Sequence, residues 1–92
     1  MKTVELIISG RVQRVGFRAC ARHIAINLGV TGEVENLTDG KVRILATGDD
    51  VILEKFISML YGCPRAIIRD IEVHQYIYSI YPDFAITRAT YG

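Results

Sequence analysis

A short stretch near the N-terminus gathers the residues best suited to chemistry. From Gly10 to Ala25 the sequence reads GRVQRVGFRACARHIA, with four arginines and two glycines where a strand pattern changes to a helix pattern. A loop that enters a helix exposes backbone N–H groups at the positive end of the helix dipole. Such a loop binds phosphate-like anions, and Arg18 in the first helical turn can grip two oxygens with its planar guanidinium.

The distribution of charge agrees with a site for a small anion. The formal net charge of +1 gives no indication of a long polyanion or a membrane surface as a partner. No acidic residue lies between Glu5 and Glu33, and the same interval holds the four arginines. From the residues alone, a surface loop with solvated arginines remains the alternative.

Other phosphate-binding patterns are absent. No lysine follows the glycines as a P-loop requires, and the Gly-x-Gly-x-x-Gly dinucleotide pattern does not occur. Cys20 follows the loop and belongs to the apolar stripe of the helix, which favours a core position over a phosphatase nucleophile. Cys20 and Cys63 are too few for a disulfide framework and too far apart for a metal knuckle, so we expect two reduced thiols.

Length and composition indicate one domain, residues 1–92. Half of the 92 residues are apolar, which suffices for a single core. The N-terminus lacks the pattern of a signal peptide, and no stretch approaches about 18 apolar residues. We therefore expect a cytoplasmic protein, a monomer, that interacts with no membrane.

Periodicity predicts the first half of the fold. Thr3–Ser9 alternates as a strand, and Phe17–Leu28 has helical spacing with Gly29 at its C-terminal end. Val30–Leu37 and Lys41–Thr47 flank the turn Thr-Asp-Gly, which is typical of an antiparallel hairpin.

The second half repeats a helix and adds two strands. Gly48–Asp50 opens a helix with a carboxylate at its N-cap, and Gly62 and Pro64 end it. Its expected buried stripe consists of Ile52, Phe56, Met59 and Leu60. Residues 65–80 read as a strand, with Gln75–Pro82 packed, and a last short strand runs from Phe84 to about Arg88. The order βαββαββ predicts a two-layer sandwich with both helices on one face of a mixed, mainly antiparallel sheet.

Two segments together resemble a known family. GRVQRVGFR, residues 10–18, followed by GEVENLTDGKV, residues 32–42, closely resembles the two signatures of the acylphosphatase family. Element order and length agree over nearly the whole chain. The resemblance implies a ferredoxin-like α+β sandwich with strand order 4-1-3-2-5. It also implies an enzyme without metal or cofactor that hydrolyses small acyl phosphates to a carboxylate and orthophosphate.

The resemblance also implies residue roles. It makes Arg18 the phosphate binder and Asn36 the residue that holds the attacking water. The matching phosphate cradle consists of Gln13, Arg14, Val15, Gly16, Phe17 and Arg18. Two positions depart from the family pattern, because Arg14 stands where glycine is usual and Glu33 where an aromatic residue is frequent. If position 14 requires a positive φ, its arginine strains the loop. The alternatives are that Arg14 adds a cation that compensates for the strain or that it points outward into solvent. Weak activity is one outcome that the two departures leave open.

Competing functions are distinguished by other residues. RNA-recognition domains share the βαββαβ plan, but the strand KVRILATG carries no aromatic residue and the net charge is nearly neutral, so no nucleic-acid partner is expected. A second alternative is a weakly active or inactive domain that binds acyl phosphate or carbamoyl phosphate, as in hydrogenase-maturation proteins. The segment GCPRA, residues 62–66, bears a slight similarity to that group.

Overall fold

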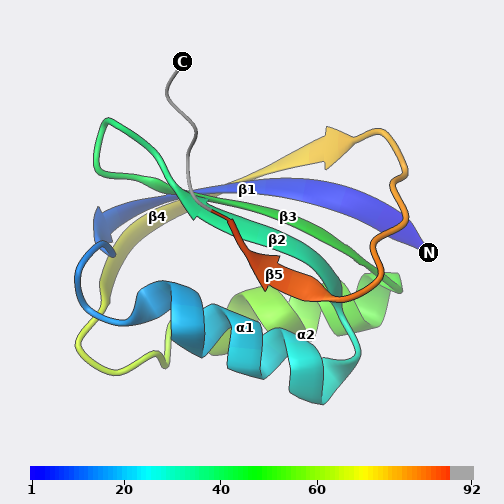
Figure 1. Cartoon of the computed structure of the whole chain (residues 1–92), viewed down its shortest axis with the longest axis horizontal. Helices are drawn as coiled ribbons and strands as arrows, with labels where there is room; N and C mark the ends of the chain where they lie inside the picture. The colour runs from blue at the N-terminus through cyan, green and yellow to red at the C-terminus, as the bar shows by residue number, and fades with distance from the viewer. Residues whose placement is uncertain (88–92) are drawn as a thin grey trace.

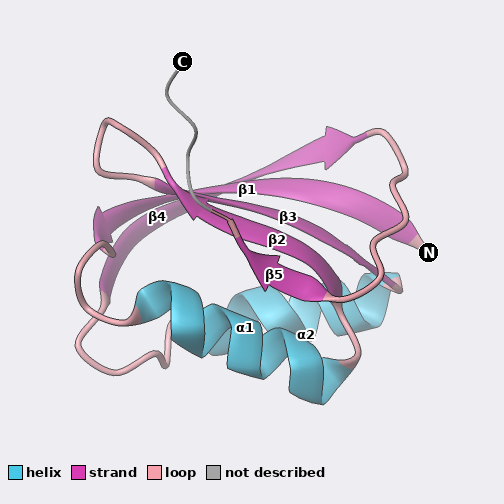
Figure 2. Ribbon diagram, viewed as in Figure 1, coloured by secondary structure: helices cyan, strands magenta, loops and turns pink. Residues whose placement is uncertain are grey.

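A five-stranded sheet with two helices on one face forms the fold (Figure 1, Figure 2). The structure, a computed structural model, describes residues 1–87. In chain order the elements are β1 (Lys2–Arg11), α1 (Phe17–Leu28), β2 (Thr31–Asn36), β3 (Val42–Gly48), α2 (Asp50–Leu60), β4 (Ile67–Tyr76) and β5 (Phe84–Ile86). The strand order β4-β1-β3-β2-β5 and the α+β sandwich confirm the expected fold.

Strand pairing places the end of β1 beside the end of β2. β1 pairs antiparallel with β3 and β4, and β2 pairs antiparallel with β3 and parallel with β5. Ile8 and Asn36 both face Val42, one from each side of β3. The loop that leaves β1 for α1 therefore starts at the same end of the sheet at which β2 finishes.

The core lies between the sheet and the helices. Alternate residues of β1 point into it, and α1 contributes a buried stripe. The largest fully buried side chains of the core are those of Phe17, Phe56, Phe84, Leu6, Ile8, Ile44 and Leu60. The rings of Phe56 and Phe84 meet edge to face with centroids 6.0 Å apart, which joins α2 to β5.

The buried face of α2 differs in part from the expected stripe. Asp49 is the N-cap, as expected, but Met59 is 42% exposed, so its place in the core was wrong. The buried residues are Leu53, Phe56 and Leu60, while Ile52 is only partly buried. Residues 51–60 carry apolar side chains on most sides of the helix, so periodicity leaves the rotation of α2 undecided and packing sets it.

β4 ends earlier than expected, and the run Gln75–Pro82 is not a packed strand. Ile77 and Ile80 are 79% and 82% exposed. The chain leaves β4 because two threonine hydroxyls hold the backbone of Ser79 over the ends of β1 and β3. Ser79 N donates to Thr3 Oγ1 at 2.9 Å, and Thr47 Oγ1 donates to Ser79 O at 2.8 Å.

A disulfide joins Cys20 in α1 to Cys63 in the segment after α2. The expectation of two reduced thiols was therefore wrong. The two Cα atoms lie 6.0 Å apart although 43 positions separate the residues in sequence, because the end of α2 packs against the first turns of α1. Cys63 is buried and Cys20 partly buried against the core, as the apolar setting of Cys20 predicted.

Two further expectations concern the last strand and membrane-spanning segments. β5 begins at Phe84, as expected, and Arg88 lies outside the described residues. Within residues 1–87, neither helix has the length and apolar character needed to cross a membrane.

Gly10 provides a test of the close approach of β1 and β4 at the point where the chain leaves the sheet for the loop. β1 has a bulge between Ser9 and Gly10. The φ of Gly10 is +128°, and a Cβ added to Gly10 would clash with the carbonyl oxygen of Ile67. We expect Gly10→Ala to lower the free energy of unfolding by about 3 to 5 kcal/mol, from overlap and backbone strain combined. Urea unfolding measures this change.

Gly40→Ala is the matched control. Gly40 also has a positive φ, +91°, but a Cβ would meet nothing within 4 Å. Its expected cost is therefore about 1 kcal/mol from strain alone. Equal losses of stability in the two variants would contradict the close approach of β1 and β4 at Gly10.

Candidate active site

The loop between β1 and α1 is anchored at both ends in the core. Val12 and Phe17 are buried, each 1% exposed, while Arg14 between them is exposed. Arg14 and Gly16 adopt left-handed backbone angles, with φ of 62° and 76°. The loop, residues 12–16, is thus a short arch, and two buried side chains and two left-handed residues set its shape.

Backbone donors of this arch are unpaired. Gly16 is the N-cap of α1 and supplies no side-chain cap, and the first turn contains no acidic residue. Within residues 1–87, the amides of positions 13–16 donate no hydrogen bond. Unpaired N–H groups at the positive end of a helix dipole form a site for an anion.

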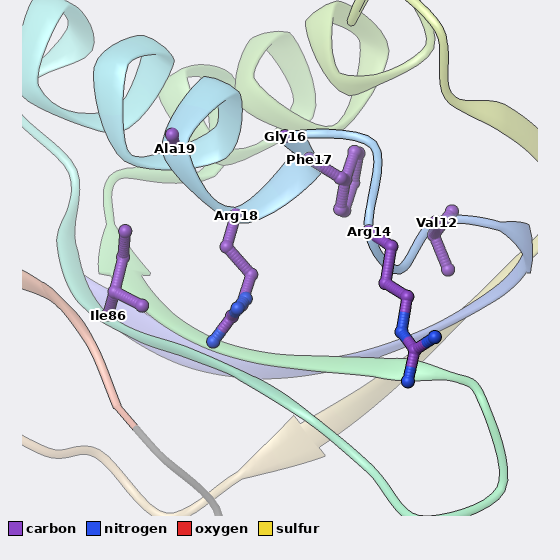
Figure 3. A pocket seen from close by; sticks show the side chains of 7 residues that line it. All are labelled: Val12, Arg14, Gly16, Phe17, Arg18, Ala19 and Ile86. Carbon is purple, nitrogen blue, oxygen red and sulfur yellow. The ribbon is translucent and has the colours of Figure 1, made fainter.

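A pocket of about 180 Å³ opens in front of the arch (Figure 3). It is lined by Val12, Arg14, Gly16, Phe17, Arg18, Ala19 and Ile86. Figure 3 shows the side chain of Arg18 extending from the first turn of α1 between Arg14 and Ile86. The ion pairs of residues 1–87 include neither Arg14 nor Arg18, so both guanidinium groups are available to an anionic ligand.

Four of the seven expected site residues line this pocket, namely Arg14, Gly16, Phe17 and Arg18. Gln13, Val15 and Asn36 do not. Val15 is partly buried and packs against the core. The structure therefore brings together the cationic part of the expected site and leaves three residues to be placed by other contacts.

Gln13 joins the arch to the turn that follows β2. Its Nε2 donates to the carbonyl oxygens of Leu37 at 2.8 Å and Lys41 at 2.9 Å. Both carbonyls belong to the turn between β2 and β3, whose first flanking residue is Asn36. Gln13 thus fixes the distance between the arch and the end of β2.

Asn36 is the last residue of β2 and lies in the row of Val42 and Ile8 on the helix-covered side of the sheet. Its side-chain oxygen Oδ1 is buried and accepts no hydrogen bond from residues 1–87. Buried polar atoms are nearly always hydrogen-bonded, so this acceptor is expected to serve a bound molecule.

Sequence reasoning missed three pocket residues, Val12, Ala19 and Ile86. Val12 lies within the motif GRVQRVGFR and Ala19 directly follows it, so both could have been included by proximity. Ile86 comes from β5, which reaches the pocket because it pairs in parallel with β2 and because Arg22 Nε donates to Phe84 O at 3.1 Å. No local pattern around Ile86 indicates this placement.

Comparisons with known proteins agree with the fold and the motifs. The acylphosphatase family model matches residues 4–86. A relative named acylphosphatase from Archaeoglobus fulgidus is 41% identical over 87 residues, which cover 94% of this chain and 98% of the relative. The chain belongs to the acylphosphatase family.

Solved structures of the family superpose closely. The acylphosphatase from Bacillus subtilis has a TM-score of 0.90 at 32% identity, covering 95% of this chain and 99% of that one. HypF from T. kodakarensis matches with a TM-score of 0.86 at 31% identity, covering 98% of this chain but 12% of HypF. The acylphosphatase fold therefore occurs both alone and within a much longer chain.

Both departures from the acylphosphatase pattern can now be placed. The φ of 62° at Arg14 is in the range that favours glycine, and an arginine there costs on the order of 1 kcal/mol. Glu33 pairs with Leu45 between two residues that face the helices, so its side chain lies on the opposite side of the sheet. The departure at Glu33 is therefore remote from the pocket.

The strain at Arg14 predicts an unusual order of stabilities. Because alanine keeps the strain and glycine relieves it, we expect Arg14→Gly to exceed Arg14→Ala by about 1 kcal/mol in free energy of unfolding. At Lys55, an exposed residue within α2, the same pair should reverse, with alanine more stable by about 1 kcal/mol. Denaturant titration of the four variants checks both signs, and alanine being the more stable at both positions would refute the strain.

Proposed function

We propose that this protein hydrolyses the carboxyl–phosphate bond of small acyl phosphates and releases a carboxylate and orthophosphate. The observation that carries the proposal is the arch of unpaired amides at the start of α1, flanked by Arg14 and Arg18, in a chain of the acylphosphatase family. The same proposal assigns the phosphoryl group to residues 13–18 and the attacking water to Asn36.

The arch suits the phosphoryl group because its charge is spread over several oxygens. Arg18 can bind two of them at once, and the loop amides can bind the third. These donors are fixed by the buried side chains of Val12 and Phe17, so little reorganisation is needed as charge develops. The geometry supports stabilisation of the transferring group in the transition state.

Asn36 suits the water because its Oδ1 is a buried acceptor without a partner in residues 1–87. A carboxamide can orient water but is too weakly basic to deprotonate it. In this proposal the water oxygen bonds to phosphorus, the bond between phosphorus and the acyl oxygen breaks, and the carboxylate leaves with the electron pair. One proton of the water stays on its oxygen, which is now bound to phosphorus, and the other moves to another phosphate oxygen.

Neither a metal nor a cofactor is part of the proposal. A carboxylate departs without a strong acid, so the protein needs only to position water in line and to stabilise the equatorial oxygens. The guanidinium of Arg18 and the amides of the arch supply positive charge for this purpose. We expect activity to be unchanged in the presence of a chelator.

Asn36→Ala is the principal test. Loss of the water-orienting group should lower kcat for benzoyl phosphate about 100- to 1000-fold with chelator present. Inhibition by inorganic phosphate should stay the same, because the arch is untouched. Asn27→Ala on the exposed side of α1 is the control and should leave kcat unchanged. Full activity of Asn36→Ala would disprove the role of Asn36, and no turnover by the native protein would disprove hydrolysis.

Gln13→Ala tests the link between arch and hairpin. Losing both hydrogen bonds should let Asn36 shift relative to the arch, and we expect kcat to fall about 10- to 100-fold with a smaller change in KM. The control is Gln75→Ala on the exposed edge strand β4, which removes the same type of side chain and should leave both kcat and KM unchanged. A rise in KM alone would instead assign Gln13 to substrate binding.

A second candidate is a domain that binds acyl phosphate or carbamoyl phosphate with weak or no turnover. The match to only 12% of HypF supports it, because the fold also serves within a longer chain, and so does the strained Arg14. Phosphate binding without turnover, with turnover appearing in Arg14→Gly, would favour this candidate. For either function we expect a monomer in the cytoplasm without a nucleic-acid partner, the last because the net charge is nearly neutral.

A further inference from the structure

The segment between α2 and β4, residues 61–66, lies against the start of α1. Figure 1 shows this segment, in yellow-green, beside the blue arch at one end of the molecule. The disulfide from Cys63 reaches Cys20, which lies two positions after Arg18. The covalent bond therefore fastens this segment beside the anion site, although the expected site residues include none of its members.

Arg65 carries the strongest sign that the segment has a role. Its φ of 67° makes it, with Arg14, one of two left-handed residues other than glycine in residues 1–87. Its guanidinium lies over the arch, because a Cβ built on Gly16 would be 3.3 Å from Arg65 Nη2. Arg65 thus approaches the N-cap of α1 from outside the pocket that Gly16 lines.

No described group neutralises this guanidinium. Among residues 1–87, the Arg65 side chain makes no ion pair and no hydrogen bond. Arg14 and Arg18 line the pocket together with Gly16, and Arg65 approaches Gly16 from outside it, so three arginines lie near the positive end of the helix. Gathering like charges raises the free energy of the unliganded protein, and a bound anion offsets that cost.

The left-handed backbone of Arg65 and the position of its guanidinium beside Gly16 together point to function, because strained backbone in a residue other than glycine is concentrated at functional sites. We propose that Arg65 is a third cation of the phosphate site and that the Cys20–Cys63 disulfide holds it there. This inference rests on the proposed function, since the anion in question is the phosphoryl group of the substrate or the product phosphate. Arg65 acts through its charge from beside the arch, so it strengthens binding more than it changes the chemical step.

Reduction of the disulfide would then weaken phosphate binding. A dithiol reductant supplies two electrons and two protons, the Cys20 and Cys63 sulfurs become thiols, and the reductant closes to its own disulfide. The segment 61–66 loses its bond to α1, and Arg65 is no longer held over Gly16. In a reducing compartment such a bond is expected to be reversible, which makes phosphate affinity dependent on redox state.

Arg65→Asn is the first experiment, because asparagine removes the charge and tolerates the left-handed backbone. Inorganic phosphate is the binding probe, measured by calorimetry, and benzoyl phosphate is the substrate. We expect the Kd for phosphate and the KM to rise about three- to tenfold at low ionic strength and less at high salt, with kcat changed less than about twofold. Lys55→Gln, which removes one positive charge from the exposed side of α2, should change neither constant.

The second experiment compares oxidised and reduced protein. Reduction with dithiothreitol should raise the phosphate Kd of the native chain by about the same factor as Arg65→Asn, and should add nothing in Arg65→Asn, because the two changes remove one interaction. Near-ultraviolet circular dichroism confirms that the reduced protein stays folded. The double variant Cys20→Ala with Cys63→Ala repeats the comparison without a reductant.

The outcomes separate this inference from the proposed function. An unchanged phosphate Kd in Arg65→Asn overturns the role of Arg65, and effects of reduction that add to those of the substitution overturn the role of the disulfide. If the native protein binds phosphate in an Arg65-dependent manner but does not hydrolyse benzoyl phosphate, the proposed function fails and the cation assignment stands. If the native protein does not bind phosphate at all, both fail.

Discussion

The first turn of an α-helix leaves backbone N–H groups without a partner, and the organisation of this protein follows from where that turn is placed. Helix α1 begins after a left-handed glycine that offers no capping side chain, one short loop beyond the central strand β1. Because β1 has neighbours on both sides, the start of α1 cannot move without disturbing the middle of the sheet. The proposed anion site is therefore attached to a strand that is paired on both sides.

The other parts of the site reach this turn through the sheet. The register of β2 on β3 puts Asn36 in the row of Ile8, and the parallel pairing of β5 with β2 brings Ile86 to the side of Arg18. The side chain of Gln13 then closes the remaining gap between arch and hairpin. The contributions of Asn36 and Ile86 depend on strand pairing, whereas that of Gln13 comes from the loop itself.

Much of this arrangement could be predicted from the sequence because it depends on local patterns. The bounds of α1 follow from apolar spacing and from Gly29, and the element order follows from the alternation of helical and strand patterns. The cradle was recognisable because its glycines and arginines are contiguous. The glycine usual at position 14 raised the question of a positive φ there, and Arg14 has one.

Other features could not be predicted because they depend on which distant segments meet. The disulfide requires that Cys63 be brought to Cys20 by the packing of α2 on α1, and single-sequence periodicity contains no such information. Met59 was misplaced because the apolar residues of α2 surround the helix, so only tertiary packing selects its buried face. Likewise, the position of Arg65 over Gly16 has no signature in the residues around it.

The strand order also governs how the protein folds. The first strand must find β4, whose partner residues lie 56 to 73 positions away, and the pocket gains Ile86 only when β5 has docked beside β2. Sheets with such distant pairings fold slowly, on roughly the millisecond to second scale, because the entropy cost of closing the intervening loop comes before the stabilising contacts form. A chain in which β5 has not yet docked lacks Ile86 in this pocket, so with the proposed function phosphate binds the finished fold more tightly and stabilises it.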